Sequence, residues 1–428
     1  MSDFEVVIIG AGAAGMMAAA AAGSQGAKVC ILEKNEKPGK KIYITGKGRC
    51  NITNACETEE LFRSVVTNPK FLYSSFYTFT NFDAIDFFEK AGVKTKVERG
   101  NRVFPVSDKS SDVIRALQKE AENNGARILF HHKVKEILIR DGKVCGVELT
   151  DGRKITADRV IVTTGGMSYP STGSEGDGFR FAVEAGHNVV SCIQGLVPMN
   201  ICSQEPAQMQ GLSMKNVEMD FFVLNKNGKK KELYREFGEM MFTHFGITGP
   251  IVLSASCYVG KYIGKETVYA ELDSKPALSK EKLHRRIVRD FESAPNASLK
   301  NSLGALLPKS MIPVVLSMAE LEGTKPVHEV TREEREKLVD TIKGMTFEVD
   351  SLRGWNEAII TRGGVDVKQI NPSTMESRKV ENLYFAGEVL DVDAVTGGFN
   401  LQIAWSTGYL AGESAAESMI KERWRKEV

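Results

Sequence analysis

The chain opens on a short apolar run, residues 4–9, that is rich in β-branched side chains. Such a run predicts a strand that is buried on both faces of a parallel sheet. Residues 14–23 consist of Ala, Met and Gly with no β-branched residue, which favours a helix. Residues 28–32 are apolar again and predict a second strand. The opening pattern therefore predicts a strand–helix–strand unit.

Helical and strand patterns continue to alternate as far as residue 195. Apolar residues at helical spacing predict two amphipathic helices, and short β-branched runs predict four strands. The expected helices are residues 82–92 and 112–124, and the expected strands are residues 127–130, 133–139, 143–149 and 160–164. The last run ends in two glycines, at the carboxyl edge where an open α/β sheet places its ligands.

The pattern changes near residue 196, where alternating strands replace the α/β pattern. Residues 214–224 and 230–237 alternate and are joined by an Asn-Gly pair, which predicts a hairpin. A long later stretch is helical in pattern and is broken by prolines. We therefore predict an insert that consists of a β-barrel unit, residues 196–275, and a helical unit, residues 276–343.

The α/β pattern returns after the insert. Residues 382–391 predict a strand that ends in Gly-Glu and an acid, and residues 396–421 predict a closing helix with glycines at its start. Glycines at a strand-to-helix turn let backbone N–H groups face an electron-rich atom. The expected fold class is α/β, with a Rossmann-like domain of residues 1–195 and 344–428 that the insert interrupts.

Composition limits the possible partners. The 428 residues carry 56 basic and 55 acidic side chains, and this balance argues against a nucleic-acid partner held by electrostatics. Residues 6–23 are uncharged but mostly Ala and Gly, too weakly apolar for a membrane span, and acidic residues precede them where a secretion signal would be basic. Seven cysteines without a C-x-x-C pair, and six histidines, predict reduced thiols, no metal site and a cytoplasmic protein.

A G-x-G-x-x-G turn, Gly10 to Gly15, joins the first strand to its helix. In a dinucleotide site Gly10 allows the tight turn, Gly12 lets the backbone approach a pyrophosphate, and Gly15 lets the helix pack close on the sheet. Glu33 ends the second strand and is expected to accept a hydrogen bond from a ribose hydroxyl. The motif stands in the strand–turn–helix context that it requires, so we predict dinucleotide binding.

Further segments combine glycine with polar residues: Gly46 to Asn54 (GKGRCNITN), Thr164-Gly165-Gly166, Phe242 to Pro250 (FTHFGITGP), Gly387-Glu388 with Asp391, and Thr396 to Gln402 (TGGFNLQ). Together with the first turn, they resemble the BaiN/RdsA-like family of FAD-dependent oxidoreductases, also called YhiN-like. The resemblance covers essentially the whole chain. The family includes three-domain flavoproteins of the aminoacetone oxidase type.

The resemblance implies FAD as the cofactor and assigns its contacts. The first turn would bind the pyrophosphate, the backbone of Val134 the adenine, and Asp391 the ribityl chain. Backbone N–H groups of residues 398–401 would face the N1 and O2 edge of the flavin, where negative charge develops on reduction. The implied FAD-binding residues are Gly10, Gly12, Ala13, Ala14, Gly15, Glu33, Lys34, Gly46, Arg49, Cys50, Asn51, Val134, Thr164, Gly165, Gly166, Gly387, Glu388, Asp391, Gly397, Gly398, Phe399, Asn400 and Leu401.

The implied reaction is hydride transfer between flavin and a small organic substrate, by amine oxidation or enone reduction. NAD(P)H or O2 would be the redox partner. One alternative is a disulfide reductase that uses Cys50 and Cys56, although the chain lacks a second G-x-G-x-x-G unit for a nicotinamide cofactor. Another alternative is a flavin-binding scaffold without turnover. The sequence leaves the substrate, the redox partner and the oligomeric state open.

His244 is the candidate proton donor or acceptor. It lies in a glycine- and proline-bounded loop of the insert, which in such a flavoprotein is placed to cover the flavin. Histidine exchanges protons near neutral pH, as catalysis at a flavin requires. The alternative is a structural histidine whose ring bonds to a backbone carbonyl and holds the loop.

Overall fold

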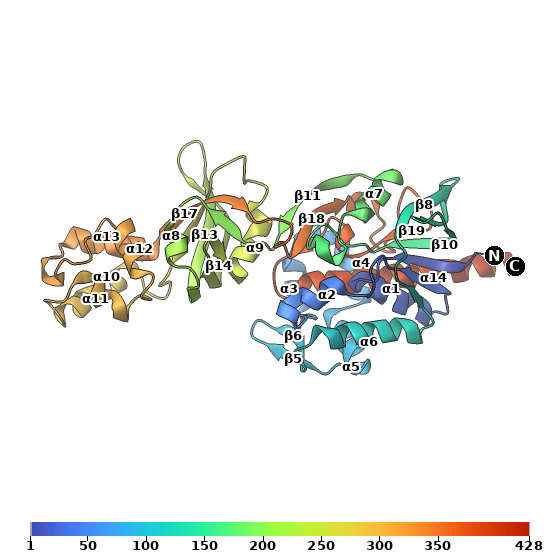
Figure 1. Ribbon diagram of the computed structural model, residues 1–428, viewed down its shortest axis with the longest axis horizontal. Helices are drawn as coiled ribbons and strands as arrows, with labels where there is room; N and C mark the ends of the chain where they lie inside the picture. The colour runs from blue at the N-terminus through green and yellow to red at the C-terminus, as the bar shows by residue number, and fades with distance from the viewer. Residues whose placement is uncertain (1, 428) are drawn as a thin grey trace. The chain divides into compact units, whose positions relative to one another are not determined.

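The computed structural model describes residues 2–427, with side chains as far as residue 421, and divides the chain into two compact units (Figure 1). The first, here called the α/β unit, comprises Met1–Gln194 and Trp355–Val428. The second, here called the barrel unit, comprises Gly195–Gly354. The chain therefore leaves the first unit once and returns to it, as an inserted unit requires.

A seven-stranded sheet forms the centre of the α/β unit. Strand β1 (Phe4–Ile9) lies between β2 (Val29–Leu32) and β10 (Lys154–Val162), and both pairings are parallel. The remaining strands are β7 (Arg127–Leu129) beside β2, β19 (Leu383–Phe385) beside β10, and the antiparallel pair β9 (Lys143–Leu149) and β8 (Val134–Arg140). Central strands of this kind are buried on both faces, which explains the unbroken apolar runs that predicted them.

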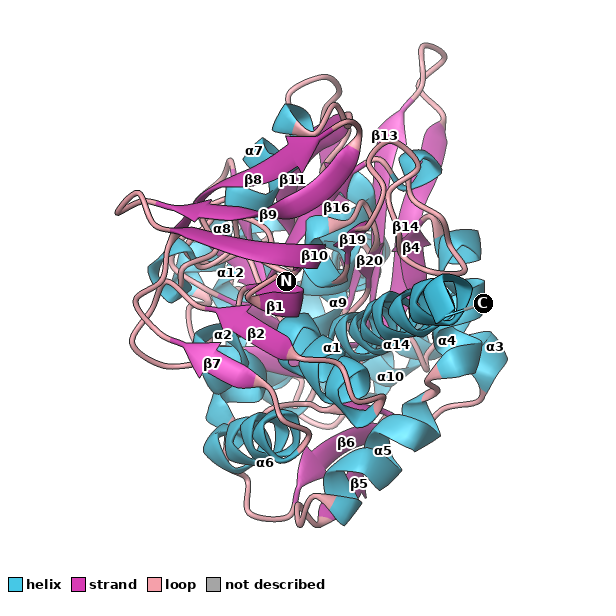
Figure 2. Cartoon of the chain, turned by 90° about the vertical axis from the view of Figure 1, so that its right-hand side faces the viewer, coloured by secondary structure: helices cyan, strands magenta, loops and turns pink. Residues whose placement is uncertain are grey.

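Helices α1 (Ala13–Ser24) and α14 (Phe399–Glu427) lie side by side against this sheet (Figure 2). Small residues permit the close approach of the two backbones. A Cβ atom at Gly408 would come within 2.5 Å of the Ala14 carbonyl oxygen, and one at Gly412 within 2.2 Å of the Ala18 carbonyl oxygen. The closing helix is therefore fixed to the opening helix by glycines that no larger residue can replace without moving a backbone.

Smaller elements complete the α/β unit. Their bounds are α2 (Lys40–Ile44), β3 (Thr53–Asn54), α3 (Thr58–Arg63), β4 (Val65–Thr67), η2 (Pro69–Leu72), α4 (Tyr73–Thr78), α5 (Asn81–Lys90), β5 (Thr95–Glu98), β6 (Arg102–Pro105), α6 (Ser110–Asn123), α7 (Asp177–Glu184), β11 (Val189–Gly195), β18 (Ile360–Val365), η6 (Val367–Gln369) and β20 (Asp393–Ala394). Helices α5 and α6 coincide closely with the two predicted amphipathic helices. Strands β11 and β18 pair with each other and return the chain to this unit.

A closed six-stranded barrel forms the core of the barrel unit, in the order β12, β15, β14, β13, β16, β17. The strands are β12 (Met199–Ile201), β13 (Ser213–Leu224), β14 (Lys230–Phe242), β15 (Gly246–Thr248), β16 (Val268–Asp273) and β17 (Met345–Leu352). The predicted hairpin is the pair β13–β14, which is longer than expected. The helices are α8 (Glu205–Gln208), α9 (Pro250–Val259), α10 (Lys280–Glu292), α11 (Leu299–Ser302), α12 (Ile312–Met318) and α13 (Arg332–Lys343).

Two of the expected domain boundaries differ from this arrangement. Strand β17 closes the barrel by pairing with β12 and β16, so residues 345–354 belong to the barrel unit and not to the α/β domain expected to resume at residue 344. The helical segment also shares one apolar core with the barrel, in which Ile287 of α10 and Leu338 of α13 join Phe347 of β17. The insert is therefore one compact unit and not the two that were expected.

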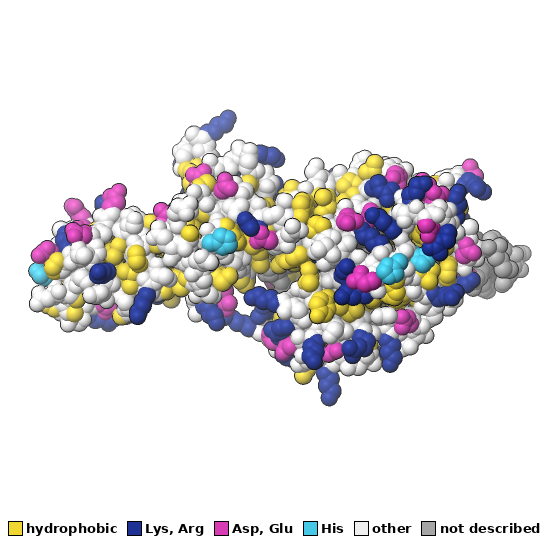
Figure 3. Space-filling model, viewed as in Figure 1, with side chains coloured by type: hydrophobic (Ala, Val, Ile, Leu, Met, Phe, Trp, Pro, Cys, Tyr) yellow, Lys and Arg dark blue, Asp and Glu magenta, His cyan; other side chains and the backbone are white. Residues whose placement is uncertain are grey.

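Positive and negative charges nearly balance in this chain, which has 56 basic and 55 acidic side chains. On the face in Figure 3, basic and acidic side chains are intermixed over the α/β unit, in keeping with a net charge of +1. Within residues 2–427, no helix has the length and apolar content needed to cross a membrane.

Candidate functional site

The first glycine turn has the geometry that its sequence predicts. Gly10 has a φ of +106°, and a Cβ atom there would lie 2.9 Å from the Thr163 carbonyl oxygen. At Gly15 a Cβ atom would lie 1.9 Å from the Gly10 carbonyl oxygen, so only glycine lets α1 approach the sheet this closely. At Gly12 an added Cβ atom would meet no other atom within 4 Å. The turn thus combines two tightly packed glycines with one that borders open space.

Free backbone donors border the same space. Helix α1 begins at Ala13 with no side-chain cap, and the N–H groups of Ala13 and Ala14 have no acceptor among the described residues. Glu33, only 7% exposed, stands at the end of the neighbouring strand β2 and accepts a hydrogen bond from the N–H of Ala11, at 2.8 Å. Its other oxygen accepts from the N–H of Asn35, also at 2.8 Å. That second oxygen also accepts from the Asn35 side-chain amide at 2.8 Å, so the oxygen facing Ala11 is the one that keeps a lone pair for a ligand hydroxyl.

Lys34 and Val134 are two further predicted FAD-binding residues; Lys34 is held by ion pairs, and Val134 by backbone pairing. The Lys34 ammonium group is 2.7 Å from Glu175 and 2.7 Å from Asp177. Burial lowers the pKa of Lys34, but the hydrogen bonds to these two carboxylates outweigh burial and raise it. Its charge is therefore already balanced within the protein. Val134 begins β8 and is buried, with its backbone paired to Leu149.

The second and third glycine turns converge on the first. Gly387 has a φ of +78°, and a Cβ atom there would lie 2.8 Å from the Ala14 side chain. Gly165 has a φ of +73°, and its Cβ position is 3.9 Å from a carboxylate oxygen of Glu388. Gly166 packs against Thr361, whose hydroxyl would be 2.2 Å from an added Cβ. The three glycine turns that the sequence singled out therefore meet at one edge of the sheet.

Glu388 anchors a polar cluster at this edge. One carboxylate oxygen pairs with the Lys41 ammonium group at 2.5 Å, and the other accepts the Thr361 N–H at 2.7 Å and the Ser168 hydroxyl at 3.0 Å. Lys41 also bonds to Ser168. Sequence reasoning found Glu388 but missed Lys41, Ser168 and Thr361, because they come from three distant segments and no local motif marks them.

The Gly46 to Asn54 segment is fastened to the start of α14. The Asn54 amide donates to the Gly397 carbonyl oxygen at 3.0 Å, and the Thr53 hydroxyl donates to the Gln402 amide oxygen at 2.6 Å. Gly398 has a φ of +100°, and a Cβ atom there would lie 2.5 Å from the Thr53 carbonyl oxygen. Two segments that are far apart in sequence therefore form one wall.

Arg49 and Cys50 are less available than their positions in the motif suggested. The Arg49 guanidinium pairs with Glu98 and, at 2.7 Å, with Asp108, and it lies 4.1 Å from the centroid of the Phe104 ring. Cys50 is fully buried, and burial raises the pKa of its thiol to about 12. A flavin at these two positions could contact the backbone or the uncharged surface of the side chains. It would not meet an unpaired guanidinium or a thiolate.

Asn51 and the start of α14 carry unused hydrogen-bonding capacity. The Asn51 side-chain oxygen is buried without a partner. The N–H groups of Phe399, Asn400 and Leu401 begin α14 and have no acceptor within the described part of the chain, while the Asn400 side chain is used in bonds to Ala394. Such a set suits a ligand edge that presents both an N–H donor and electron-rich acceptors. The pyrimidine edge of a flavin has this pattern, so the residues fit the implied cofactor.

Asp391 lies deeper in the unit. It is 8% exposed, and burial together with the nearby Asp393 raises its pKa, while a hydrogen bond from the Asn68 amide acts in the opposite direction. Asp393 is in turn paired with Arg362 at 2.9 Å. Thr164 is not oriented toward a ligand, since its unpaired hydroxyl would be 2.2 Å from a Cβ atom at Gly178 of α7.

His244 belongs to the other unit, in the turn between β14 and β15. Its side chain is exposed and packs edge-on against Phe245, with 5.0 Å between ring centroids. Its ring has no hydrogen-bond partner in the described chain, so the carbonyl bond expected of a structural histidine is not found.

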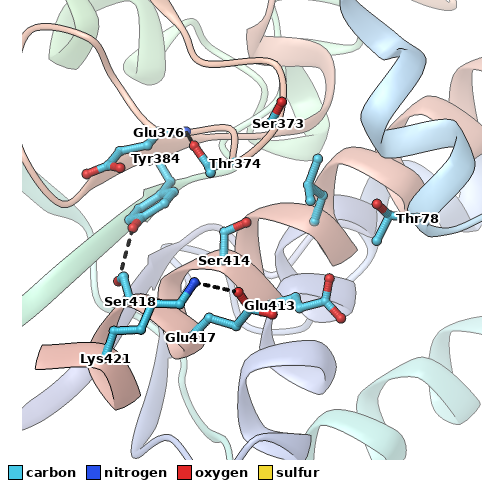
Figure 4. A pocket seen from close by; sticks show the side chains of 11 residues that line it. Thr78, Ser373, Thr374, Glu376, Tyr384, Glu413, Ser414, Glu417, Ser418 and Lys421 are labelled. Atoms are coloured by element: carbon cyan, nitrogen blue, oxygen red, sulfur yellow. Dashed lines mark hydrogen bonds and ion pairs between the residues drawn. The ribbon is translucent and has the colours of Figure 1, made fainter. Parts of the chain in front are cut away.

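A hollow of about 310 Å³ on the α/β unit lies apart from these residues (Figure 4). It is bordered by Tyr384, which bonds to Ser418 at 3.3 Å, and by Lys421, which pairs with Glu417 at 3.2 Å. Its walls contain none of the predicted FAD-binding residues, and three carboxylates make it unsuited to phosphates: Glu376, Glu413 and Glu417. Among the side chains that the structure describes, residues 2–421, no group of three or more potential metal ligands occurs.

Comparison with known proteins agrees with this geometry. Residues 4–414 match the family described as HI0933-like protein Rossmann domain. The 3-dehydro-bile acid delta(4,6)-reductase of Clostridium scindens is 34% identical over 415 residues, which cover 96% of this chain and 98% of the relative. The ribosomal RNA dihydrouridine synthase of Escherichia coli is 30% identical with the same coverage.

Solved structures share the fold at low identity. The 3-ketosteroid delta1-dehydrogenase of Sterolibacterium denitrificans has a TM-score of 0.51 at 12% identity, covering 97% of this chain and 99% of the other. An E. coli quinol fumarate reductase chain also has a TM-score of 0.51, at 17% identity, covering 98% of this chain and 71% of the other. Together with the family match and the two full-length relatives, the geometry leads to one conclusion: this chain belongs to the HI0933-like family, the BaiN/RdsA-like FAD-dependent oxidoreductases.

Proposed function

We propose that this chain binds FAD and reduces a carbon–carbon double bond that is conjugated to a carbonyl group. The observation that carries the proposal is the convergence of the glycine turns beside Gly12, where open space borders unpaired helix N–H groups. The reaction class is supported by the two relatives, whose names denote a delta(4,6)-reductase and a dihydrouridine synthase. Both names describe hydrogen added to a double bond, which favours enone reduction over amine oxidation.

The residues around the turns can each hold one part of the cofactor. The start of α1 would bind the pyrophosphate, and Glu33 the adenosine ribose. The start of α14 and Asn51 would bind the pyrimidine edge of the flavin. Bound FAD supplies hydride chemistry, and the N–H groups at the start of α14 favour the negative charge of its reduced form.

A conjugated double bond also needs a proton after it accepts a hydride, so a proton donor must reach the substrate. We propose His244 for this role because its exposed ring is not committed to any bond within the described chain. His244→Gln should keep FAD and thermal stability while the half-reaction with substrate slows by roughly 10²–10⁴, the usual effect of a lost general acid. Unchanged kinetics would remove His244 from the mechanism, and loss of FAD or of folding would favour a structural role.

The two relatives are named for different classes of substrate, a bile acid and ribosomal RNA. Overall charge neutrality predicted no nucleic-acid partner, yet a relative with 30% identity is named for a reaction on ribosomal RNA. Neutrality therefore does not decide between a small enone and a uracil ring within RNA. NAD(P)H remains our proposed source of electrons.

An anaerobic experiment tests the reaction class. The flavin is reduced with one equivalent of dithionite and then mixed with a steroid 4-en-3-one, a uridine-containing RNA, or an amine. The flavin absorbance should return with the enone or the RNA and not with the amine. If neither unsaturated compound reoxidises the flavin, or if the amine bleaches the oxidised protein, double-bond reduction is the wrong reaction.

A further inference from the structure

A second hollow in the α/β unit, with a volume of about 320 Å³, has a different chemical character. It lies where η2 (Pro69–Leu72) meets η6 (Val367–Gln369) and the loop that follows. Its lining residues are Asn68, Lys70, Phe71, Val367, Lys368, Ile370, Pro372 and Arg378, and we call it the basic pocket. None of the lining residues is acidic.

Three positive charges at the rim of the basic pocket are uncompensated. Lys70, Lys368 and Arg378 are exposed, and none of them forms an ion pair within the described part of the chain. The Arg378 guanidinium donates to the Ile370 carbonyl oxygen at 3.2 Å, which orients it at the rim. Asp366 is close in sequence, but its carboxylate accepts the Lys368 N–H at 3.0 Å and caps η6. Three unpaired cations around one concavity favour a multiply charged anion.

The floor of the basic pocket is apolar. Phe71, Val367 and Ile370 line the pocket and are themselves buried, and we call them its floor. A volume near 320 Å³ lies at the lower end of the range of about 300–1,000 Å³ for small-ligand sites. The space therefore suits an anionic group with one attached ring system, and it is too small for an entire dinucleotide.

We propose that the basic pocket binds a phosphate group with its attached nucleoside. The rim cations would hold the phosphate oxygens, and the apolar floor would contact the ring. A free nucleotide and an RNA chain both present this chemistry, and they are distinguished by experiment.

Asn68 connects the basic pocket to the candidate flavin site. Its amide donates to the Asp391 carbonyl oxygen at 2.8 Å and to the Asp391 carboxylate at 3.1 Å. Strand β4, which ends just before Asn68, pairs with β20 next to this aspartate. A ligand in the basic pocket would therefore contact the same residue that fixes Asp391.

Calorimetry on the FAD-saturated protein tests the proposal, because bound FAD prevents probes from entering the dinucleotide site. The probes are inorganic phosphate, uridine monophosphate and a uridine decamer, at about 50 mM salt, where phosphate contacts are strong. We expect one of the two nucleotide probes to bind more tightly than inorganic phosphate, since only a nucleoside covers the apolar floor. Binding of uridine monophosphate assigns the pocket to a free nucleotide, and binding of the decamer alone assigns it to RNA.

Matched variants locate the binding. The triple change Lys70→Gln, Lys368→Gln and Arg378→Gln should weaken binding of the responding probe at least about tenfold and reduce its salt dependence. The control is Lys94→Gln, Lys109→Gln and Lys119→Gln, which removes the same charge from exposed lysines outside the pocket and should change affinity less than about twofold.

Several outcomes would overturn the proposal. They are binding no tighter than about 1 mM for every probe, equal affinities for inorganic phosphate and the nucleotides, or equal losses in the two triple variants. If the pocket triple variant loses its FAD spectrum or its thermal transition, Lys368→Gln alone replaces it, with an expected loss of about threefold. The experiment involves no turnover, so failure of the proposed reduction would leave its result intact.

Discussion

Gly12 and Gly15 stand three residues apart in one turn, yet enlarging Gly15 should lower the stability of the fold, while enlarging Gly12 should lower the affinity for FAD. In Gly15→Ala the new Cβ atom would lie 1.9 Å from the Gly10 carbonyl oxygen and 2.6 Å from the Thr163 hydroxyl. Ordinary contact begins at 3.4 Å, so backbone must move by about 1.5 Å. Overpacking costs roughly 1–3 kcal/mol, and an unyielding backbone atom places this case near about 3 kcal/mol.

Gly12→Val meets no such obstacle in the protein itself. No atom lies within 4 Å of the Cβ position, and the φ of −87° and ψ of −165° are ordinary extended backbone. Valine would instead fill the open space that the pyrophosphate of FAD requires. We therefore expect an affinity for FAD that is at least about 100-fold weaker, equivalent to about 2.7 kcal/mol.

Two assays separate these effects. Thermal unfolding of the FAD-stripped protein should show a Tm lowered by about 6–12 °C in Gly15→Ala, at roughly 2–4 °C per kcal/mol for a unit of this size, and changed by less than about 2 °C in Gly12→Val. Titration with FAD, followed by flavin fluorescence, should show the loss of affinity in Gly12→Val. Wild-type affinity in that variant would mean that the phosphates bind elsewhere, and an unchanged Tm in Gly15→Ala would refute the close helix–sheet contact.

Further outcomes follow from the same geometry. FAD should copurify and be released by denaturation, and flavin that stays with the denatured chain would show a covalent link. Burial raises the pKa of the Cys50 thiol to about 12 and that of Cys56 to about 11, so neither should react with iodoacetamide at pH 8 in the folded protein. Rapid labelling would revive the disulfide-reductase alternative. Hydrogen bonds from Arg49 to Glu98, and from Lys96 and Arg49 to Asp108, lower the pKa of each carboxylate below its ordinary 4.5 and 3.8. Depressed carboxylate pKa values stabilise the fold above the ordinary values and lose this effect as pH falls through the lowered ones. The Tm difference between wild type and Arg49→Gln should therefore be constant above about pH 5 and shrink below about pH 4, and a difference independent of pH would contradict the pairing.

Local sequence patterns correctly predicted those helices and strands whose environment follows from their own residues. The run at residues 4–9 became β1 because an unbroken apolar stretch has one stable environment, the middle of a parallel sheet. The predicted strand at residues 160–164 ends at Val162, and the Thr163 hydroxyl that follows donates to the carbonyl oxygens of Ile9 and Gly10, at 2.9 and 3.0 Å. That bond depends on a strand more than 150 residues away, which a local pattern cannot report.

The sequence did not reveal which strands pair with one another or which charged side chains form ion pairs. The eight residues of β17 alternate as a strand should, but alternation does not say which sheet the strand joins, and so the barrel boundary was misplaced. The family resemblance implied that Arg49 lies near the flavin, while its pairing with Glu98 and Asp108 depends on the β5–β6 hairpin, which no pattern had indicated. The glycine turns could be recognised in the sequence. The polar side chains that surround them are brought there by contacts between distant segments, which the sequence does not reveal.

The contact between α1 and α14 also sets an order of events during synthesis. The barrel unit is continuous in sequence, so its own contacts can all form once residue 354 has left the ribosome. The α/β unit must wait, because β19 and α14 are made last and must close long loops, which include the barrel unit, to reach β10 and α1. Nascent chains that stop before residue 383 would lack one wall of the candidate cofactor site altogether. If the chain binds FAD as proposed, the cofactor can enter a complete site only after α14 has been made and has packed on α1 through Gly408 and Gly412.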